Sequence, residues 1–469
     1  MTDQIVNFFA ALTALGSPPA SDPNDGMSAG AAFIPTDLDP QNQTRSDARR
    51  AYFDPYASRP NFHVITGQLV TRINFAGSRD DQGSTAQATA GTQNGNGASA
   101  GLGNDGLFGT GSSEPPSAAG GNPEPGRIKP RQANGGLRVT GVEFATNAAA
   151  PRRKVSATRE VIAAAGAVHS AQLLQLSGIG PRPLLERFGI NVALDLPGVG
   201  NNLQDHFLVG TFYPYNNVST SPANLTQDPT YNAKARVEYY SSKSGPWTAG
   251  SPNALAFPSL PSGSRLSARI LQSAAEQDAN AYLVQGLDPT VIAGYRAQKA
   301  SLVQSLSSRN NAAWEIINNN IGSLPVAIMH PFTRGTVYIN SIEPFNPPII
   351  DPRYGSNPTD LQILVEALKF NRRILASPSM VELSPAQFVP PAEAGDEELL
   401  QIIKSGIRTE YHPSGTLAML PRELGGVVDS RLRVYGTANL RVVDAGIFPL
   451  IPAAHLQASV YAVAEKVSC

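Results

Sequence analysis

The stretch VVDAGIFPLIPAAHLQ, Val442–Gln457, decides the fold together with a shorter stretch before it, YHPSGT, Tyr411–Thr416. Each stretch holds one of the six histidines of the chain, His455 in the first and His412 in the second, close to glycine or proline. Glycine and proline hold the backbone in tight, non-helical shapes, so these imidazoles are fixed in position. Because an imidazole titrates near neutral pH, two of them at one point can accept a proton and stabilise the charge that develops. The pair predicts acid–base chemistry on a small molecule.

The residues around these histidines resemble the FAD-dependent glucose-methanol-choline (GMC) oxidoreductase family. His412 in HPSGT and His455 in IPAAHLQ match the two active-site histidines of that family, and VDAG at 443–446 matches its flavin-contacting turn. Other blocks agree, in the same order along the chain: REVIAAAGAVHSAQLLQLSGIGP (159–181), LPGVGNNLQDH (196–206) and HPFTRGTVYINSIEPFNPPIIDPRY (330–354). The resemblance covers residues 20–76 and 137–469.

The resemblance implies a role for each histidine. In relatives that oxidise an alcohol, one histidine accepts the hydroxyl proton while a hydride leaves carbon for flavin N5, and the other orients or stabilises the oxygen. His412 would be the principal base. His455, expected at the start of a helix, would lie near the positive end of the helix dipole, which lowers its pKa and keeps it neutral. The alternative for both histidines is that they only cap turns.

The resemblance also implies an FAD site. The backbone of Val70 would meet the adenine, and Gly166 would let the backbone come close to the cofactor. Asp444 and Ala445 would bind the flavin through backbone amides and the carboxylate, and Gln457 is assigned to the same site. An ordinary strand residue at Val70 and a turn-forming aspartate at Asp444 are the alternatives.

The expected fold is α/β, of the α+β kind: an incomplete FAD-binding Rossmann-like domain and a substrate domain with an antiparallel sheet flanked by helices. The expected domains are a substrate-domain-associated segment at 1–60, part of the FAD-binding domain at 61–207, the substrate-binding domain at 208–428 and the C-terminal part of the FAD-binding domain at 429–469.

Hydrophobic periodicity and breaker residues predict the elements. The predicted helices are 3–15, 45–54, 170–177, 266–278, 289–306, 311–319, 360–375, 397–405 and 455–467. The predicted strands are 62–65, 68–75, 137–146, 159–165, 326–329, 336–340, 349–351 and 440–444. Strands 68–75 and 137–146 are expected to pair as a hairpin.

Residues 77–136 differ in composition from the rest of the chain, because fifteen of the 42 glycines lie there among Ser, Asn, Ala and Pro. With so little apolar surface to offset the entropy of ordering, this segment is predicted to be a disordered insertion. Its GLGNDG at 101–106 spells the dinucleotide fingerprint GxGxxG. That motif works between a strand and a helix, and neither is predicted on its flanks, so it is not interpreted as a phosphate site.

One part of the family pattern is not matched. Members begin with a strand, a GxGxxG turn and a helix that hold the FAD pyrophosphate, and this sequence matches only from a point after them. Three hypotheses follow. The chain is a GMC-type alcohol oxidase or dehydrogenase whose missing segment a second chain supplies or the gene model lost. Alternatively it is a flavin-independent lyase or isomerase on the same scaffold, or a non-catalytic truncated remnant.

Composition excludes several other classes. A formal charge of -1 without basic runs argues against nucleic acid, and no apolar run reaches the length of a membrane span. The single cysteine, Cys469, allows no disulfide framework, and the histidine spacings give no zinc pattern, so no metal is predicted. The N-terminus makes a poor secretory signal, which favours the cytoplasm. His169 is interpreted as structural, and His206 either caps a turn or lies near the flavin.

Overall fold

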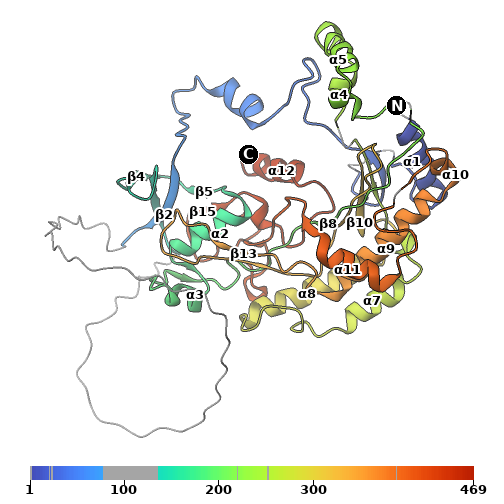
Figure 1. The fold of residues 1–469 in the computed structure, drawn as a ribbon. Coiled ribbons are helices and arrows are strands. Elements are labelled where there is room, and N and C mark those ends of the chain that lie inside the picture. The colour runs from blue at the N-terminus through green and yellow to red at the C-terminus, as the bar shows by residue number, and fades with distance from the viewer. Residues whose placement is uncertain are drawn as a thin grey trace, which may run out of the picture.

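The structure is a computed structural model that describes residues 3–20, 22, 25–77, 136–218, 220–250, 253–386 and 388–468. Its elements form two packed groups (Figure 1), each with its own apolar core. One core is built around a six-stranded sheet and the long helix α9 (Pro358–Leu375). The other is built around helix α2 (Gly166–Leu176) and several short strands. The expected mixture of helices and antiparallel sheet is confirmed.

The six-stranded sheet is antiparallel throughout. Its strands, in spatial order, are β1 (Gly30–Phe33), β9 (Ala254–Phe257), β10 (Trp314–Asn318), β11 (Val326–Ile328), β8 (Phe207–Val209) and β14 (Ile407–Thr409). Helix α9 packs on one face of this sheet through residues such as Phe370, whose ring meets Trp314 of β10 edge to face. Side chains alternate across a strand, so Glu315, the next residue of β10, points to the opposite face.

Three further helices of ten or more residues pack against α9 in this core. They are α1 (Asp3–Ala14), α7 (Ser267–Glu276) and α11 (Asp396–Gly406). Apolar residues recur along α9 at helical spacing and are buried, which is why this helix was predictable. Since the helices cover one face, the other face of the sheet is left for the segments that carry the histidines.

The second core holds the predicted hairpin. Strands β2 (Leu69–Phe75) and β3 (Val139–Ala145) pair antiparallel, and β4 (Arg153–Ser156) pairs with β3 on its other side. The expected pairing across the Gly-rich segment is therefore confirmed. Residues 78–135 of that segment, with the GLGNDG motif, lie outside the described residues.

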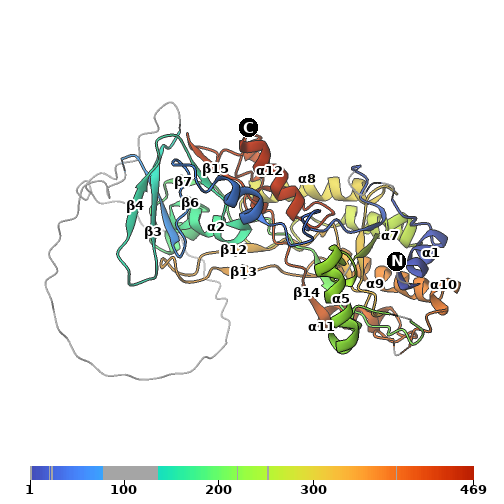
Figure 2. The same ribbon diagram turned by 90° about the horizontal axis from the view of Figure 1, so that it is seen from above.

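Strand β5 (Val161–Ala163) pairs in parallel with β15 (Leu440–Val442), and α2 begins three residues after β5. This pairing brings the 159–181 block beside the C-terminal block, although they are far apart in the chain. Figure 2 shows α2 beside β12 (Thr336–Tyr338), which pairs with β13 (Ile349–Asp351).

Helix α12 (Gln457–Ser468) begins two residues later than the predicted start at His455.

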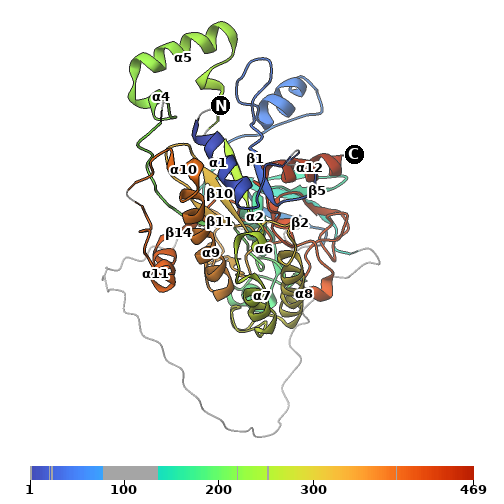
Figure 3. The ribbon, with the colours of Figure 1, turned by 90° about the vertical axis from the view of Figure 1, so that its right-hand side faces the viewer.

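The remaining elements are short, apart from α8 and α5. The helices are η1 (Arg49–Phe53), η2 (Asp54–Tyr56), α3 (Arg182–Arg187), α4 (Asn224–Gln227), α5 (Pro229–Ser242), η4 (Pro246–Thr248), α6 (Leu260–Gly263), α8 (Pro289–Leu306), α10 (Pro378–Val381), η5 (Arg422–Leu424) and η6 (Ala445–Ile447). The strands are β6 (Ile179–Gly180) and β7 (Leu194–Asp195). Figure 3 shows α4 and α5 standing away from the body of the protein.

Two predicted elements were wrong. The segment 311–319 contains strand β10 and not a helix, because Trp314 and Ile316 pack into the core between β9 and β11 and this packing overrides local preference. Residues 62–65 form no strand, and Val64 and Ile65 are exposed. The alternation of residue types predicted a strand here, but no neighbouring strand pairs with this segment in the structure.

No helix within the described ranges is both long and apolar enough to cross a membrane. The domain boundaries inferred from the sequence stay a prediction.

Candidate active site

His412 and His455 meet in space. His412 lies in the loop that follows β14, and His455 lies in the segment that precedes α12. Their ring centroids are 5.3 Å apart, with the ring planes tilted by 43°. The side chain of His455 is 34% exposed and that of His412 is 16% exposed, so neither is sealed by packed side chains. Forty-three positions of chain thus separate two imidazoles that share one partly open site.

The backbone before His412 turns sharply. Tyr411 adopts a left-handed φ of 64°, and its side chain is 85% exposed. A non-glycine residue in this region is strained unless its surroundings hold it. Asp205 provides such support: its carboxylate accepts hydrogen bonds from the backbone N–H of His412 at 2.9 Å and from the Thr409 hydroxyl at 2.6 Å. This local geometry points His412 inward while Tyr411 points to solvent.

A third histidine, His206, lies behind His412. The rings are nearly perpendicular, with centroids 5.1 Å apart, and their Nδ1 atoms are 3.0 Å apart. On the other side of its ring, Nε2 of His206 lies 3.1 Å from the backbone oxygen of Met329. The sequence left the role of His206 open between a turn cap and a position near the flavin; the structure makes it the hydrogen-bond partner of His412.

These contacts determine which nitrogen of each ring carries the proton. His206 is fully buried, and burial lowers its pKa well below the ordinary value, so the ring is neutral. The Met329 carbonyl only accepts, so Nε2 of His206 carries the proton and Nδ1 presents a lone pair. The Nδ1–H of His412 then donates to that lone pair. Nε2 of His412 is left as an unprotonated, basic nitrogen.

The charge state of His412 also favours a role as a base. Burial, followed by the charge of His455, lowers the pKa of His412 to about 4. Its imidazole is therefore neutral and ready to accept a proton across the neutral range. Protonation of His412 blocks that function only in acid.

This pKa gives a first prediction. In FAD-loaded protein, kcat/KM for an alcohol is expected to fall by about tenfold per pH unit below pH 4, because the protonated ring cannot act as a base. No loss of activity is expected as pH decreases through the ordinary histidine range around pH 6.5. A pH profile of kcat/KM measures this, and an acid limb centred near pH 6.5 would contradict it.

His455 differs from the expectation. Its Nε2 lies 3.0 Å from Oε1 of Glu315, whose side chain is completely buried. Burial alone would lower the pKa of His455, but the hydrogen bond and the charge of Glu315 together outweigh it, and the pKa is raised. The predicted lowering by a helix dipole was wrong, because α12 begins only at Gln457 and a carboxylate contacts the ring directly.

A second prediction tests this ion pair. Glu315→Gln keeps a hydrogen-bond acceptor but removes the charge, so the pKa of His455 is expected to fall below its wild-type value. A pH titration followed by NMR of histidine-labelled protein measures that pKa. Glu343→Gln, which changes a carboxylate paired with Arg152 away from this site, is the matched control. An unchanged pKa in Glu315→Gln would exclude Glu315 as the cause.

Sequence reasoning missed Glu410. This residue lies two positions before His412, and its side chain is only 8% exposed. Its oxygens lie 3.7 Å from Nε2 of His455 and 3.9 Å from Nδ1 of His412. Burial, followed by the charge and hydrogen bond of Glu315 and the charge of Asp205, raises the pKa of Glu410 to about 10. Glu410 is thus a neutral acid beside the histidine pair at neutral pH.

Two groups of these side chains bring metal-ligand atoms together. The ligand atoms within each group lie within 4.8 Å of one another, and the groups are His206, Glu410 and His412, and Glu315, Glu410 and His455. No metal was predicted from the sequence, because the spacing of the histidines along the chain matches no metal-binding motif. Such spacing cannot reveal these groups, since their side chains come from segments far apart in the chain.

The residues expected to contact FAD occupy a second part of the site. The carboxylate of Asp444 accepts hydrogen bonds from the Gly166 N–H at 3.0 Å, the Ser170 hydroxyl at 2.5 Å and the Gly446 N–H at 2.8 Å. Asp444 is buried. Through these bonds Asp444 connects the start of α2 to the turn at η6. The expectation that its carboxylate also binds the flavin stays a prediction.

The histidine loop is joined to the same turn. Gly415 donates its backbone N–H to the oxygen of Ala445 at 3.1 Å, and Leu417 donates to Gly446 at 2.8 Å. The segments around Gly166, Ala445 and His412 therefore form one hydrogen-bonded unit. Ala445 contributes only its backbone groups to this unit.

The residues present fit a flat cofactor over this unit. Gly166 has a φ of 79°, and a Cβ added there would meet no atom within 4 Å, so the backbone at the start of α2 is open to a ligand. Val70 on β2 is 40% exposed, and Gln457 is exposed in the first turn of α12. The roles of Val70, Gly166, Ala445 and Gln457 in binding stay a prediction.

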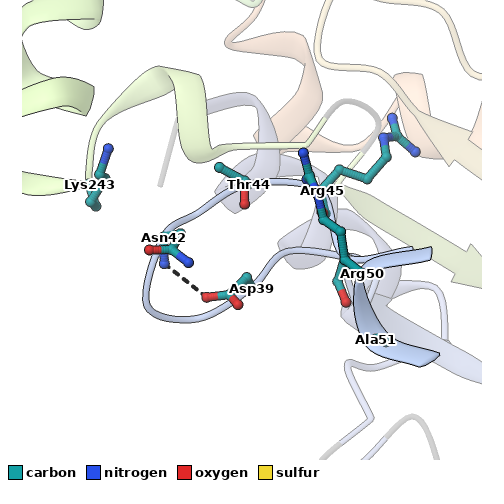
Figure 4. A pocket seen from close by; sticks show the side chains of 8 residues that line it. Asp39, Asn42, Thr44, Arg45, Arg50, Ala51 and Lys243 are labelled. Carbon is teal, nitrogen blue, oxygen red and sulfur yellow. Dashed lines mark hydrogen bonds between the residues drawn. The ribbon is translucent and has the colours of Figure 1, made fainter. Parts of the chain in front are cut away.

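A large cavity elsewhere does not serve these residues. Its volume is about 660 Å³, and Figure 4 shows its polar lining. The lining residues are Asp39, Asn42, Thr44, Arg45, Ser46, Arg50, Ala51 and Lys243. Asp39 already accepts the backbone N–H of Asn42, and the Lys243 ammonium lies over the Tyr239 ring. With its polar groups engaged locally and no histidine in its lining, this cavity is not the candidate site.

Two family models match the chain. Both are described as GMC oxidoreductase, and they match residues 129–208 and 331–464. These ranges contain Gly166, His206, His412 and His455. They include the segments that carry the histidine pair, whereas Glu315, Met329 and Val70 lie outside them.

Curated relatives and solved structures agree with the family models. The chain is 31% identical to dehydrogenase xptC of Emericella nidulans and 32% identical to the GMC oxidoreductase family protein Mala s 12 of Malassezia sympodialis, over 96% and 99% of its length. An FAD-dependent oxidoreductase from Chaetomium thermophilum is 32% identical, with a TM-score of 0.83 over 99% of this chain and 70% of that one. A fungal aryl-alcohol oxidase is 28% identical, with a TM-score of 0.81 over 100% of this chain and 70% of that one.

The chain spans 64% of the length of the two curated relatives. About a third of each relative therefore has no counterpart among residues 1–469.

Proposed function

Because the chain belongs to the GMC oxidoreductase family, we propose that it carries the catalytic part of an FAD-dependent oxidoreductase that oxidises the CH–OH group of a small-molecule alcohol. The observation that supports this most strongly is the chain of hydrogen bonds from Met329 through His206 to His412. It leaves a basic Nε2 on His412 beside a second imidazole, in a site that is partly open.

His412 accepts the hydroxyl proton of the alcohol at Nε2. As the proton arrives, the imidazolium of His412 is stabilised by the hydrogen bond that its Nδ1–H donates to His206. His206 cannot take this proton onward easily, because it is completely buried and its pKa is far below the ordinary value. The proton therefore stays on His412 until it leaves towards solvent.

His455 holds the oxygen of the alcohol. Glu315 raises its pKa and fixes its ring through Nε2, so the Nδ1 side remains for a hydrogen bond to the substrate oxygen. A positioned donor near a developing alkoxide stabilises it most in a site that excludes water. Glu315 acts through His455 and is a positioning residue.

FAD, when bound, supplies the acceptor for the hydride that leaves the carbinol carbon. On this chain the backbone around Gly166 and Ala445, with Val70 and Gln457, would hold it. Asp444 keeps the first two segments together by accepting hydrogen bonds from both.

We further propose that the pyrophosphate of FAD is bound by a segment outside residues 1–469, in the way that a helix N-terminus binds phosphate in dinucleotide sites. A second chain is one source of that segment. The support is the third of each relative that this chain does not span.

The visible spectrum of the purified protein tests the proposed function. A flavin absorption band that disappears on anaerobic addition of an alcohol, after loading with FAD, is the expected result. A colourless protein that still converts a substrate, and loses this ability in His412→Ala, would favour a flavin-independent lyase or isomerase. A colourless and inert protein, also in the presence of the missing segment of a relative, would favour a remnant without catalysis.

A further inference from the structure

One buried residue, Gln204, is bonded to both loops that carry the histidine pair. It lies two residues before His206. Its backbone pairs with that of Ser414, two residues after His412. The Gln204 N–H donates to the Ser414 oxygen at 3.0 Å, and the Ser414 N–H donates to the Gln204 oxygen at 2.8 Å. The backbone of Gln204 therefore holds the loop that carries His412.

The side chain of Gln204 holds the other loop. Its Oε1 accepts the backbone N–H of Ile451 at 3.2 Å, and its Nε2 donates to the oxygen of Pro449 at 3.1 Å. Ile451 is buried, so its N–H requires a partner within the protein. These two residues precede His455 by four and six positions. One glutamine thus fixes both histidine loops, the first through its backbone and the second through its amide.

The loop that carries His455 depends on such side-chain bonds. Residues 448–456 lie between η6 and α12 and belong to no helix or strand. The position of this loop is therefore set by the groups that bond to its backbone. The Pro449 oxygen accepts two further amide donors, Asn202 Nδ2 at 3.3 Å and Gln298 Nε2 at 2.8 Å. These bonds hold the first part of the loop.

The bond between Gln204 and Ile451 lies closer along the chain to His455. We propose that Gln204 is a positioning residue that sets the separation of His412 and His455. This role rests on the proposed function, in which one imidazole accepts the hydroxyl proton while the other stabilises the oxygen, so both rings must reach one hydroxyl group. A displacement of about 1 Å in such a site can cost about 10²-fold in rate. Gln204 acts through the two loops and not on the alcohol itself.

Gln204→Met tests this role, because methionine is unbranched like glutamine but its thioether donates no hydrogen bond and accepts only weakly. The backbone pairing with Ser414 remains, so only the loop of His455 is released. His455 should then lose part of its contact with Glu315, and its pKa should fall from the raised wild-type value towards the ordinary value of about 6.5. A pH titration followed by NMR of histidine-labelled protein measures that pKa.

Steady-state kinetics of FAD-loaded protein give a second readout. In Gln204→Met, kcat for an alcohol is expected to fall by about 10- to 10²-fold, with a smaller change in KM, because the displaced ring contributes mainly in the transition state. In a double-mutant cycle, adding Gln204→Met to His455→Ala should change kcat by no more than about twofold, since the residue through which it acts is gone. A loss in the His455→Ala background as large as that in the wild type would show a general structural effect and would overturn the proposal.

Gln175→Met is the matched control. Gln175 is also buried and has the same pattern of bonds, with Nε2 donating to the Val337 oxygen and Oε1 accepting the Ile339 N–H, both at 2.9 Å. Gln175→Met should lose stability in urea unfolding as Gln204→Met does, while its His455 pKa stays at the wild-type value. Gln204→Asn, whose amide is one methylene shorter, replaces Gln204→Met if that variant does not fold, with the same expected result.

A folded Gln204 variant whose His455 pKa equals that of the wild type would overturn the proposal. An equal fall of that pKa in Gln175→Met would show loosening of the whole protein and would overturn it as well. Wild-type protein that oxidises no alcohol would instead overturn the proposed function, and the pKa of His455 would still decide whether Gln204 positions this histidine.

Discussion

His412→Ala is expected to lower kcat for alcohol oxidation by about 10²–10⁴-fold in FAD-loaded protein, the range that a positioned general base contributes. The loss follows from the geometry, because Nε2 of His412 is the basic nitrogen that the bond to His206 leaves free. FAD content should remain close to that of the wild type, since the His412 side chain holds no part of the turn at Ala445. Steady-state kinetics and the flavin absorption of the same samples measure both quantities.

His63→Ala is the matched control, because His63 is exposed and lies outside the site. Its kcat should equal that of the wild type. A decrease of less than about tenfold in His412→Ala would fall outside the general-base range and would contradict the role of His412 as proton acceptor. A decrease that is explained fully by lost flavin would assign His412 a role in binding and not in proton transfer.

Asp444→Ala is expected to decrease both stability and FAD content. The substitution removes the acceptor for three donors, Gly166 N–H, Ser170 O–H and Gly446 N–H, inside a buried site. Leaving buried donors without a partner costs about 1–3 kcal/mol each, and the three share one acceptor, so we expect the free energy of unfolding to fall by about 3 kcal/mol. Urea unfolding measures this change, and the flavin absorption of the folded protein measures the FAD content.

Asp444→Asn separates shape from charge, since the amide oxygen still accepts hydrogen bonds. It should lose less stability than Asp444→Ala. Asp195→Ala is a second control, because it removes a partly exposed aspartate that pairs with Arg182 at the surface. If Asp444→Ala unfolds at the same urea concentration as wild type, Asp444 does not connect the start of α2 to the η6 turn in the manner described.

The sequence was most informative where one short segment carries both position and chemistry. His412 and His455 each lie in a motif with glycine or proline, so their importance could be read without coordinates. The hairpin of β2 and β3 could be predicted because alternating apolar residues persist on both sides of the Gly-rich segment. Helix α9 was predictable because its buried residues recur at helical spacing along its whole length.

The partners of the histidines could not be predicted, because they come from segments far apart in the chain. Glu315 lies on a strand that was expected to be a helix, and only the packing of Trp314 against α9 shows which face it occupies. His206 and Met329 meet through the pairing of β8 with β11, which no local pattern encodes. Glu410 is the exception. It lies two residues before His412, and a carboxylate so close to a candidate base was a signal that could have been used.

The pKa of His455 shows the same limit. A helix start beside His455 suggested a lowered pKa. In the structure the pKa of His455 is raised, because its direct contact with the buried carboxylate of Glu315 outweighs a dipole effect. Local sequence predicts the ends of helices to within a few residues. It does not predict which charged group a distant strand brings into contact.

The most direct test of the account is the protonation state of each histidine nitrogen at neutral pH, measured by nitrogen NMR on protein labelled at its six histidines. We predict that His412 is neutral with its proton on Nδ1, and that His206 is neutral with its proton on Nε2. Variants at each position assign the signals. A cationic His412, or a neutral His412 with its proton on Nε2, would leave no basic nitrogen for the alcohol and would contradict the proposed role of His412.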